Sequence, residues 1–390
     1  MPFNSEGVEP GVGLALSGGG FRATLFHLGS LWRLNELGYL PKLDRVSSVS
    51  GGSITAGLLA VRWGQLQWAD GIATNFVAMI ADPLRAFCAR SIDGPAIGEG
   101  ALLPWKRISD VVQGEYAAHL LGKGTLQDLL DRPRFVFDTT NFATGVSFRF
   151  SKPYAGDYRI GLLPNPTFPV ALAVTASSAF PPFLSPVIVE PDPAAFQRTK
   201  GADLFDQEAY RRRLVLTDGG VYDNLGLETV WNRYQTILVS DAGAPFSPAP
   251  DPATDWTRQS LRAMDVATNQ ARALRKRALI ADYQAKTRMG SYWGIMTGIA
   301  EYQLPDALPV SLESTTYLST LRTRLNPFSE EEQGRLINGG YALCDAAMRK
   351  HVIPGQAVKP PRWPYPAYAL NQPMPPAPSQ PVAPDPPSGR

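Results

Sequence analysis

Three short motifs rich in glycine and serine carry the side chains suited to acyl-transfer chemistry. The first is Ser48-Val49-Ser50-Gly51-Gly52, between an expected strand and an expected helix. In this setting small neighbours let the chain turn sharply and expose the central serine, Ser50, as a nucleophile. The following helix N-terminus favours negative charge at that point. A turn that only connects and caps the two elements is the alternative interpretation.

The second motif is the glycine loop Gly18-Gly19-Gly20, followed by Phe21 and Arg22. Successive glycines leave backbone N–H groups unscreened, which suits an oxyanion or a phosphate group. A dinucleotide-binding turn is a weaker interpretation, because Ala23 replaces the last glycine of Gly-x-Gly-x-x-Gly. A tight structural turn is also open, and Arg22 either orients the loop or faces solvent.

The third motif is Asp218-Gly219-Gly220, directly after an expected strand over 214–216. The glycines let the chain turn and leave Asp218 near the crevice at the strand ends. Asp138 and Asp241 also follow expected strands, so they are further candidates. Together the motifs supply a nucleophile, a base and oxyanion donors.

The chain contains only three histidines, which limits the possible mechanisms. A Ser-Asp-His triad in α/β-hydrolase order would need His351, three residues before a proline-rich tail. We expect His27 to be a packed or capping histidine, and His119 has no motif around it. Ser50 as nucleophile with Asp218 as base is therefore favoured over a triad that includes His351.

The elements that must position these motifs alternate between strands and helices. Apolar runs predict strands over 11–16 and 45–49, and each is followed by a glycine turn and an amphipathic helix. This order is typical of βαβ units and a parallel sheet. Later strands are expected at 135–137, 214–216 and 237–239, and a long helix at 256–283, capped by Thr254 or Asp255.

At these motifs, over about residues 11–230, the chain resembles the patatin-like phospholipases, serine acyl hydrolases with a Ser-Asp dyad. The segment 176–183 is similar to the one that precedes the aspartate motif in that family. Ala23 and Ser48 stand where the family has glycine. The resemblance implies an α/β fold of three layers, with a central, mainly parallel sheet flanked by helices. It also implies ester lipids as substrates and these site residues: catalytic Ser50 and Asp218, oxyanion-hole Gly18, Gly19 and Gly20, and supporting Arg22, Gly52, Gly219 and Gly220.

Composition bounds the remaining function classes and the domain organisation. The formal net charge of 390 residues is only +2, which argues against an electrostatic nucleic-acid binder. Proline is concentrated after residue 353, where 13 of the 36 prolines occur. We expect one patatin-like domain over 1–353 and a proline-rich, disordered tail over 354–390.

The chemistry outlined above requires no metal or organic cofactor. The two cysteines have no metal-ligand spacing, and prolines interrupt the longest uncharged run, 160–189, so a membrane span is not expected. The N-terminus lacks a signal-peptide pattern, which favours a cytoplasmic protein. The stretches 180–184 and 292–296 could line an acyl groove or contact a membrane interface, and ordinary core packing is the alternative. The arginines at 211–213 and the basic residues at 272–277 could meet anionic headgroups, and exposed, solvated faces are the favoured alternative.

Two other classes of protein stay open at this point. A nucleotide-binding protein would use the glycine loop for phosphate, and an inactive patatin-like module would bind lipid or a partner without hydrolysis. The sequence leaves the headgroup, the acyl position and the oligomeric state undefined.

Overall fold

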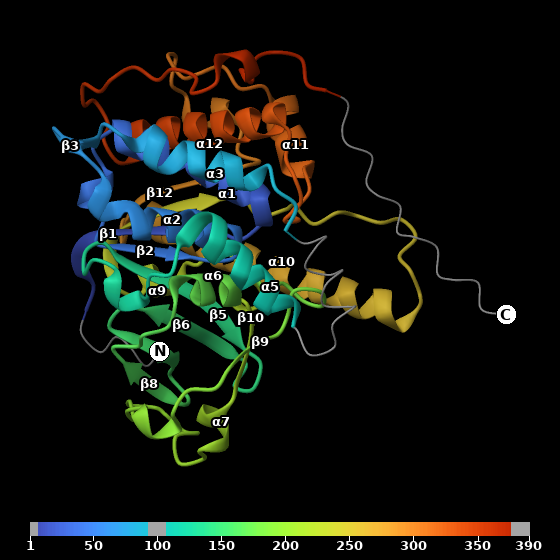
Figure 1. Cartoon of the computed structure of the whole chain (residues 1–390). Helices are drawn as coiled ribbons and strands as arrows, with labels where there is room; N and C mark the ends of the chain where they lie inside the picture. The colour runs from blue at the N-terminus through green and yellow to red at the C-terminus, as the bar shows by residue number, and fades with distance from the viewer. Residues whose placement is uncertain (1–6, 93–106, 376–390) are drawn as a thin grey trace.

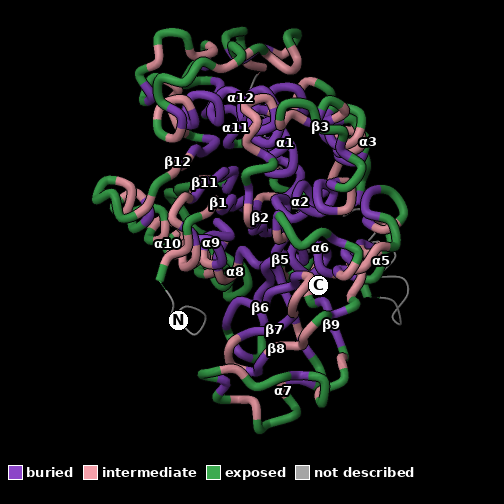
Figure 2. The backbone as a smooth tube through the Cα atoms, turned by 90° about the vertical axis from the view of Figure 1, so that its left-hand side faces the viewer, coloured by how far each residue is buried: buried purple, intermediate pink, exposed green. Residues whose placement is uncertain are grey.

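A ten-stranded mixed sheet forms the centre of the computed structural model, which describes residues 7–92 and 107–375. The main strand order is β12-β11-β1-β2-β5-β6-β7-β8, while β10 pairs with β5 and β9 with β10. Figure 2 shows this succession of strands from the side. The strand bounds are β1 Glu9–Leu16, β2 Arg45–Ser48, β5 Arg134–Asn141, β6 Val146–Ser151, β7 Tyr154–Asp157, β8 Gly161–Pro164, β9 Val187–Val189, β10 Leu214–Asp218, β11 Tyr234–Asp241 and β12 Met289–Gly294, with a separate hairpin of β3 Trp68–Ala69 and β4 Ile72–Ala73.

Helices cover both faces of the sheet, so the predicted three-layer α/β fold is confirmed. In Figure 1, α1, α2 and α12 lie on one side of the parallel strands, and α9 and α10 lie on the other. The helix bounds are α1 Gly20–Glu36, α2 Gly51–Arg62, α3 Asp82–Cys88, α5 Ile108–Tyr116, α6 Val170–Ser178, α7 Ala209–Arg212, α8 Gly220–Asp223, α9 Glu228–Trp231, α10 Trp256–Gln284, α11 Leu312–Thr320 and α12 Glu330–His351. None of the helices within the described ranges is long and apolar enough to cross a membrane.

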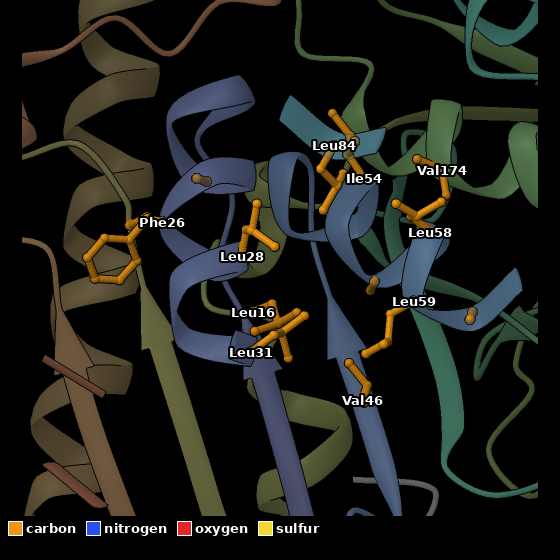
Figure 3. Close-up of a cluster of buried hydrophobic side chains, with 14 of the residues drawn as sticks. Leu16, Phe26, Leu28, Leu31, Val46, Ile54, Leu58, Leu59, Leu84 and Val174 are labelled. Carbon is orange, nitrogen blue, oxygen red and sulfur yellow. The ribbon is translucent and has the colours of Figure 1, made fainter. Parts of the chain in front are cut away.

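The alternation of side chains along β1 explains the layers. Leu14 and Leu16 belong to the large core shared with α1, α2 and α12, whereas Ala15 belongs to the smaller core under α9 and α10. Successive strand residues point to opposite faces, so both faces of this central strand are buried. Figure 3 shows Leu28 and Leu31 of α1 close to Leu16.

The parallel half of the sheet follows the predicted βαβ order. β1 pairs in parallel with both β2 and β11, and β2 pairs in parallel with β5. Gly38, after the end of α1, has a φ of 63°, a left-handed conformation that glycine adopts without strain. Gly38 therefore ends α1 without backbone strain, and the glycine turns after β1 and β2 fall at the same end of the sheet.

Two strand predictions differ from the structure because they depend on distant partners. The strand expected at 135–137 continues through Asn141, since β6 pairs along its whole second half. Asp138 is therefore a mid-strand residue, and the prediction that it follows a strand end was wrong. β10 ends at Asp218 but runs antiparallel to β5, so Asp218 does not lie at the carboxyl end of a parallel strand.

The described part of the predicted tail, residues 354–375, packs against α12. The side-chain amide of Asn338 donates to the carbonyl oxygens of Tyr365 and Tyr368 at 2.8 and 2.9 Å, and Leu370 is fully buried. Packed structure therefore continues beyond the expected boundary at 353, because aromatic and apolar residues interrupt the prolines here. Residues 376–390 lie outside the described ranges.

Candidate active site

Ser50 lies at a strained turn between β2 and α2. Its φ and ψ are 53° and −124°, a region that costs a residue with a side chain about 1–3 kcal/mol. A Cβ added at Gly51 would lie 2.0 Å from the carbonyl oxygen of Gly20, and one at Gly52 would lie 2.5 Å from that of Leu16. The small neighbours predicted for a nucleophile elbow are thus sterically required.

Ser177, at the end of α6, holds the turn in place. The backbone N–H of Ser50 donates to the carbonyl oxygen of Ser177 at 3.0 Å and to its hydroxyl at 3.1 Å. The same carbonyl oxygen accepts from the N–H of Gly219 at 3.3 Å. Ser177 therefore connects the serine turn to the aspartate turn.

The Asp218 carboxyl group lies buried beside Ser50. Its Oδ1 accepts from the N–H of Gly220 at 2.7 Å, whereas Oδ2 has no hydrogen-bond partner within the described part of the chain. Burial raises the pKa of Asp218 to about 7, and the Gly220 N–H and the Ser50 hydroxyl oppose that rise. An aspartate with this pKa can take up a proton near neutral pH.

Gly19 and Gly20 line a cavity together with Ser50 and Asp218. The N–H of Gly18 points elsewhere, because it donates to the carbonyl oxygen of Asn224 at 3.0 Å. Gly20 has a φ of 55°, and a Cβ there would lie 1.8 Å from the carbonyl oxygen of Thr323. Gly20 is also the first residue of α1, whose N-terminus favours negative charge.

Arg22 is fully buried behind this loop, so the alternative that it faces solvent is excluded. Its guanidinium donates to the carbonyl oxygens of Ser319, Leu321 and Ala242 at 2.8 to 2.9 Å. Burial and then the nearby Arg272 lower the pKa of Arg22 to about 9, which leaves it charged at neutral pH. Arg22 thus fixes the first turn of α1 against segments far away in the sequence.

The cavity has a volume of about 410 Å³. The loop after α6 lines it with Phe180, Pro181, Phe183 and Leu184, and the helix α10 lines it with mainly polar side chains. Phe183 is 63% exposed, so this apolar loop also reaches the surface. The cavity thus joins an apolar surface to the buried pair of Ser50 and Asp218.

Comparison with known proteins decides the family. The sequence profile described as patatin-like phospholipase matches residues 14–231, more than half of the chain. The chain belongs to the patatin-like phospholipase family. No curated protein matches it.

Solved structures that match the chain include human GIVD cytosolic phospholipase A2 and its complex with methyl gamma-linolenyl fluorophosphonate. These two share 14% and 16% identity with the chain, with TM-scores of 0.46 and 0.49. The match covers 86% of this chain but only 61% and 57% of the human chains. VipD from Legionella pneumophila matches with 15% identity and a TM-score of 0.34, over 86% of this chain and 66% of VipD. The chain thus spans about three fifths of the human structures' length.

Both departures from the patatin-like motifs occupy tightly packed positions. Ala23 is completely buried, 3.2 Å from the place of a Cβ on Gly19. The Ser48 hydroxyl donates to the carbonyl oxygen of Val136 at 3.3 Å and accepts from Ser53 at 2.9 Å. These small side chains therefore fit without displacing the loop or the turn.

The structure places the three histidines away from the cavity. Nε2 of buried His27 donates to the carbonyl oxygen of Ser17 at 2.9 Å, and its Nδ1 lies 2.8 Å from the Ser240 hydroxyl. Burial lowers the pKa of His27 to about 4, so this ring is neutral and packed, as expected. Neither His119 nor His351 lines the cavity.

The other two aspartate candidates have partners of their own. Asp138 accepts from the Ser47 hydroxyl at 2.8 Å and does not line the cavity. Asp241 accepts from Arg272 at 2.7 Å and from the Tyr292 hydroxyl at 2.6 Å. Although burial opposes it, the Arg272 cation lowers the pKa of Asp241. Of the three, Asp218 is the one that borders the cavity.

Two of the stretches considered for lipid contact contain buried residues. Trp293 is fully buried and Arg211 is 8% exposed, so each of the segments 292–296 and 211–213 contributes at least one side chain to the protein interior.

No group of three or more histidine, cysteine, aspartate or glutamate side chains in the described residues could hold a metal.

Sequence reasoning missed two contributions to the cavity. Residues 323–325 enter its wall from a segment without a motif. One face of α10 also lines it through Arg262, Asp265 and Asn269, which the sequence analysis did not single out, beside Arg272, which it did. Their spacing of three and four residues was a readable signal of a polar helix face.

Proposed function

We propose that the protein is a lipid acyl hydrolase that cleaves carboxylic esters through Ser50 and Asp218. The observation that carries the proposal is the buried Oδ2 of Asp218, which has no hydrogen-bond partner among the described residues and lies beside a strained serine turn at a cavity. A carboxylate in this position can accept the Ser50 proton while Oγ attacks the ester carbonyl. Family membership and the apolar loop 180–184 support lipid esters, met at a membrane surface, as the substrate class.

In the proposed reaction, the N–H groups of Gly19 and Gly20 stabilise the oxyanion of the tetrahedral intermediate. Protonated Asp218 then gives its proton to the leaving alkoxide, and the acyl group stays on Ser50 Oγ. Water, deprotonated by the same carboxylate, attacks the acyl-enzyme, and the proton returns to Ser50 as the fatty acid leaves. Every proton taken from a nucleophile is thus returned to a leaving group.

A serine-directed fluorophosphonate, together with hydrolysis of a medium-chain ester, tests the proposal. Ser50→Ala should abolish labelling, and Ser50→Ala and Asp218→Asn should each lower kcat by about 10⁴-fold or more. His351→Ala is the control and should keep both signals. If the wild type neither labels nor hydrolyses esters in the presence of vesicles, the proposal fails in favour of an inactive, lipid-binding module.

A further inference from the structure

Asn224, directly after α8, contacts the glycine loop through its main chain. Its carbonyl oxygen accepts from the N–H of Gly18 at 3.0 Å. This bond keeps one backbone donor of the loop away from the cavity, and Gly18 is not among the lining residues. The side chain of Asn224, in contrast, lines the cavity beside Ser50.

The Asn224 amide lies beside both of the groups that we propose to react. A Cβ added at Gly18 would lie 2.2 Å from its Oδ1 and 3.1 Å from the Cβ of Ser50. A Cβ added at Gly220 would lie 2.6 Å from the same Oδ1 and 2.9 Å from Oδ1 of Asp218. Since each pair of atoms surrounds one point, the amide is close to both the serine and the aspartate side chains.

The hydrogen-bonding capacity that this amide has left is its two N–H donors. Oδ1 faces the backbone of the two glycines, and Nδ2 is the other end of the amide. The side chain of Asn224 forms no hydrogen bond with any residue in the described ranges. An amide N–H carries partial positive charge and suits an oxygen on which negative charge develops.

Asp223 fixes the position of Asn224. Its buried carboxylate accepts from the N–H groups of Leu225, Leu227 and Glu228 at 2.9 to 3.2 Å. Together with the bond to the glycine loop, these bonds hold the chain around Asn224 in place. A donor fixed in this way needs no reorganisation when an oxyanion forms.

We propose that Asn224 is a further catalytic residue and that its Nδ2–H donates to the oxyanion of the tetrahedral intermediate. It acts with the N–H groups of Gly19 and Gly20 and supplies the third donor that Gly18 does not provide. This inference rests on the proposed hydrolase function and deepens it, because it names a side chain that touches the reacting oxygen. Asn224 transfers no proton. It binds the negative oxygen while Ser50 Oγ is bonded to the carbonyl carbon, and the bond weakens when the carbonyl group forms again.

Steady-state hydrolysis of a medium-chain ester by Asn224→Leu and Asn224→Ala tests this proposal. Leucine keeps the branched shape of the side chain without its donors, and both variants retain the main-chain carbonyl group that holds Gly18. We expect kcat to fall about 10²-fold or more in both variants, with little change in KM, since the bond forms in the transition state. Thermal melting shows whether each variant is folded.

A trifluoromethyl ketone with the same acyl chain separates binding of the oxyanion from other effects of the substitutions. Ser50 Oγ adds to its carbonyl carbon, the serine proton passes to Asp218, and the carbonyl oxygen becomes an oxyanion that stays bound. The corresponding secondary alcohol has the same chain but cannot form an oxyanion. The inhibition constant of the ketone should rise in Asn224→Leu by the factor by which kcat/KM falls, whereas that of the alcohol should not change.

Asn371→Leu is the matched control for the substitution itself. Asn371 is exposed and lies outside the cavity lining. This variant should keep the kcat, the KM and both inhibition constants of the wild type.

A wild-type kcat in Asn224→Leu would overturn this inference and leave the hydrolase proposal intact. Equal weakening of the ketone and the alcohol would also overturn it, because Asn224 would then only shape the cavity. If Asn224→Leu does not fold, the same comparison in Asn224→Ala decides. Absence of Ser50 labelling and of all hydrolysis in the wild type would instead refute the proposed function.

Discussion

Ser48 and Asp218 are the last residues of two strands that both pair with β5. Ser48 pairs with Phe137 of β5, and Asp218 pairs with Thr139. β2 runs parallel to β5 and ends at Ser48, whereas β10 runs antiparallel and ends at Asp218. The two strand ends therefore meet head to head beside β5. The turn after β2 carries Ser50, so this pairing brings the serine and the carboxylate to one point.

The buried carboxyl group of Asp218 should make the protein less stable as pH rises. Its folded-state pKa of about 7 exceeds its ordinary value of 3.8, so the folded state binds the proton more tightly. The stabilisation is complete below about pH 4 and is lost as pH rises through 7. Asp218→Asn should therefore be more stable than the wild type at pH 8, by a few kcal/mol, but not at pH 4. Urea unfolding at both pH values measures this, and an equal difference at both would contradict it.

The rate of ester hydrolysis should rise with pH and reach half of its maximum near pH 7. Only the ionised form of Asp218, whose pKa burial raises to about 7, can accept the serine proton. Asp138 is an internal control, since burial also raises its pKa to about 7 although it does not line the cavity. The pH profile of kcat/KM for Asp138→Asn should keep the inflection. A shifted inflection in that variant would show that Asp138 contributes to the titration and would contradict its assignment to Asp218.

Gly20→Ala should abolish hydrolysis and destabilise the protein. The added Cβ would meet the carbonyl oxygen of Thr323 at 1.8 Å, and the φ of 55° disfavours a side chain. Gly114, exposed in α5, is the matched control because nothing lies within 4 Å of an added Cβ. Gly114→Ala should keep full activity and gain up to about 1 kcal/mol of stability in thermal melting. Full activity in Gly20→Ala would show that the loop has no part in the reaction.

Asp345→Ala should lower the free energy of unfolding by about 3–5 kcal/mol, because it leaves the buried cation of Arg33 without its main partner. The Arg33 Nη2 and Asp345 Oδ1 atoms are 2.7 Å apart, and both side chains are almost fully buried. Arg349 pairs with the same carboxylate at 2.9 Å but is partly exposed. Arg349→Ala should cost clearly less in the same urea titration, and equal costs would contradict the argument from burial.

The sequence was sufficient for features set by neighbouring residues. The glycine turns, the helices after them and the long helix α10 were predicted, because each depends on local spacing and capping. Asp255 indeed caps α10, accepting from the N–H of Arg258 at 3.0 Å. The Ser50–Asp218 pair was inferred from three motifs and a family resemblance, and its catalytic role awaits the labelling experiment.

Features set by distant partners were beyond the sequence. The direction of β10 depends on its pairing with β5, and the burial of Arg22 depends on carbonyl groups at 242 and 319–321. The expected oxyanion-hole role of the Gly18 N–H does not fit the structure for the same reason, since only the fold shows that this N–H donates to the carbonyl oxygen of Asn224. Hydrophobic periodicity contains no information on any of these pairings.

The support of the glycine loop by residues near 320 has a consequence for biosynthesis. Ribosomes make the chain from its N-terminus, so Ser50 and Asp218 leave the exit tunnel before Ser319, Leu321 and Thr323 have been added. A growing chain thus contains both Ser50 and Asp218 while Arg22 still lacks two of its three carbonyl acceptors. At that stage Gly20 also lacks the segment around Thr323 that packs against it. The loop can reach its final conformation only after residues 319–323 have been made, which ties the onset of the proposed activity to synthesis of the chain beyond that segment.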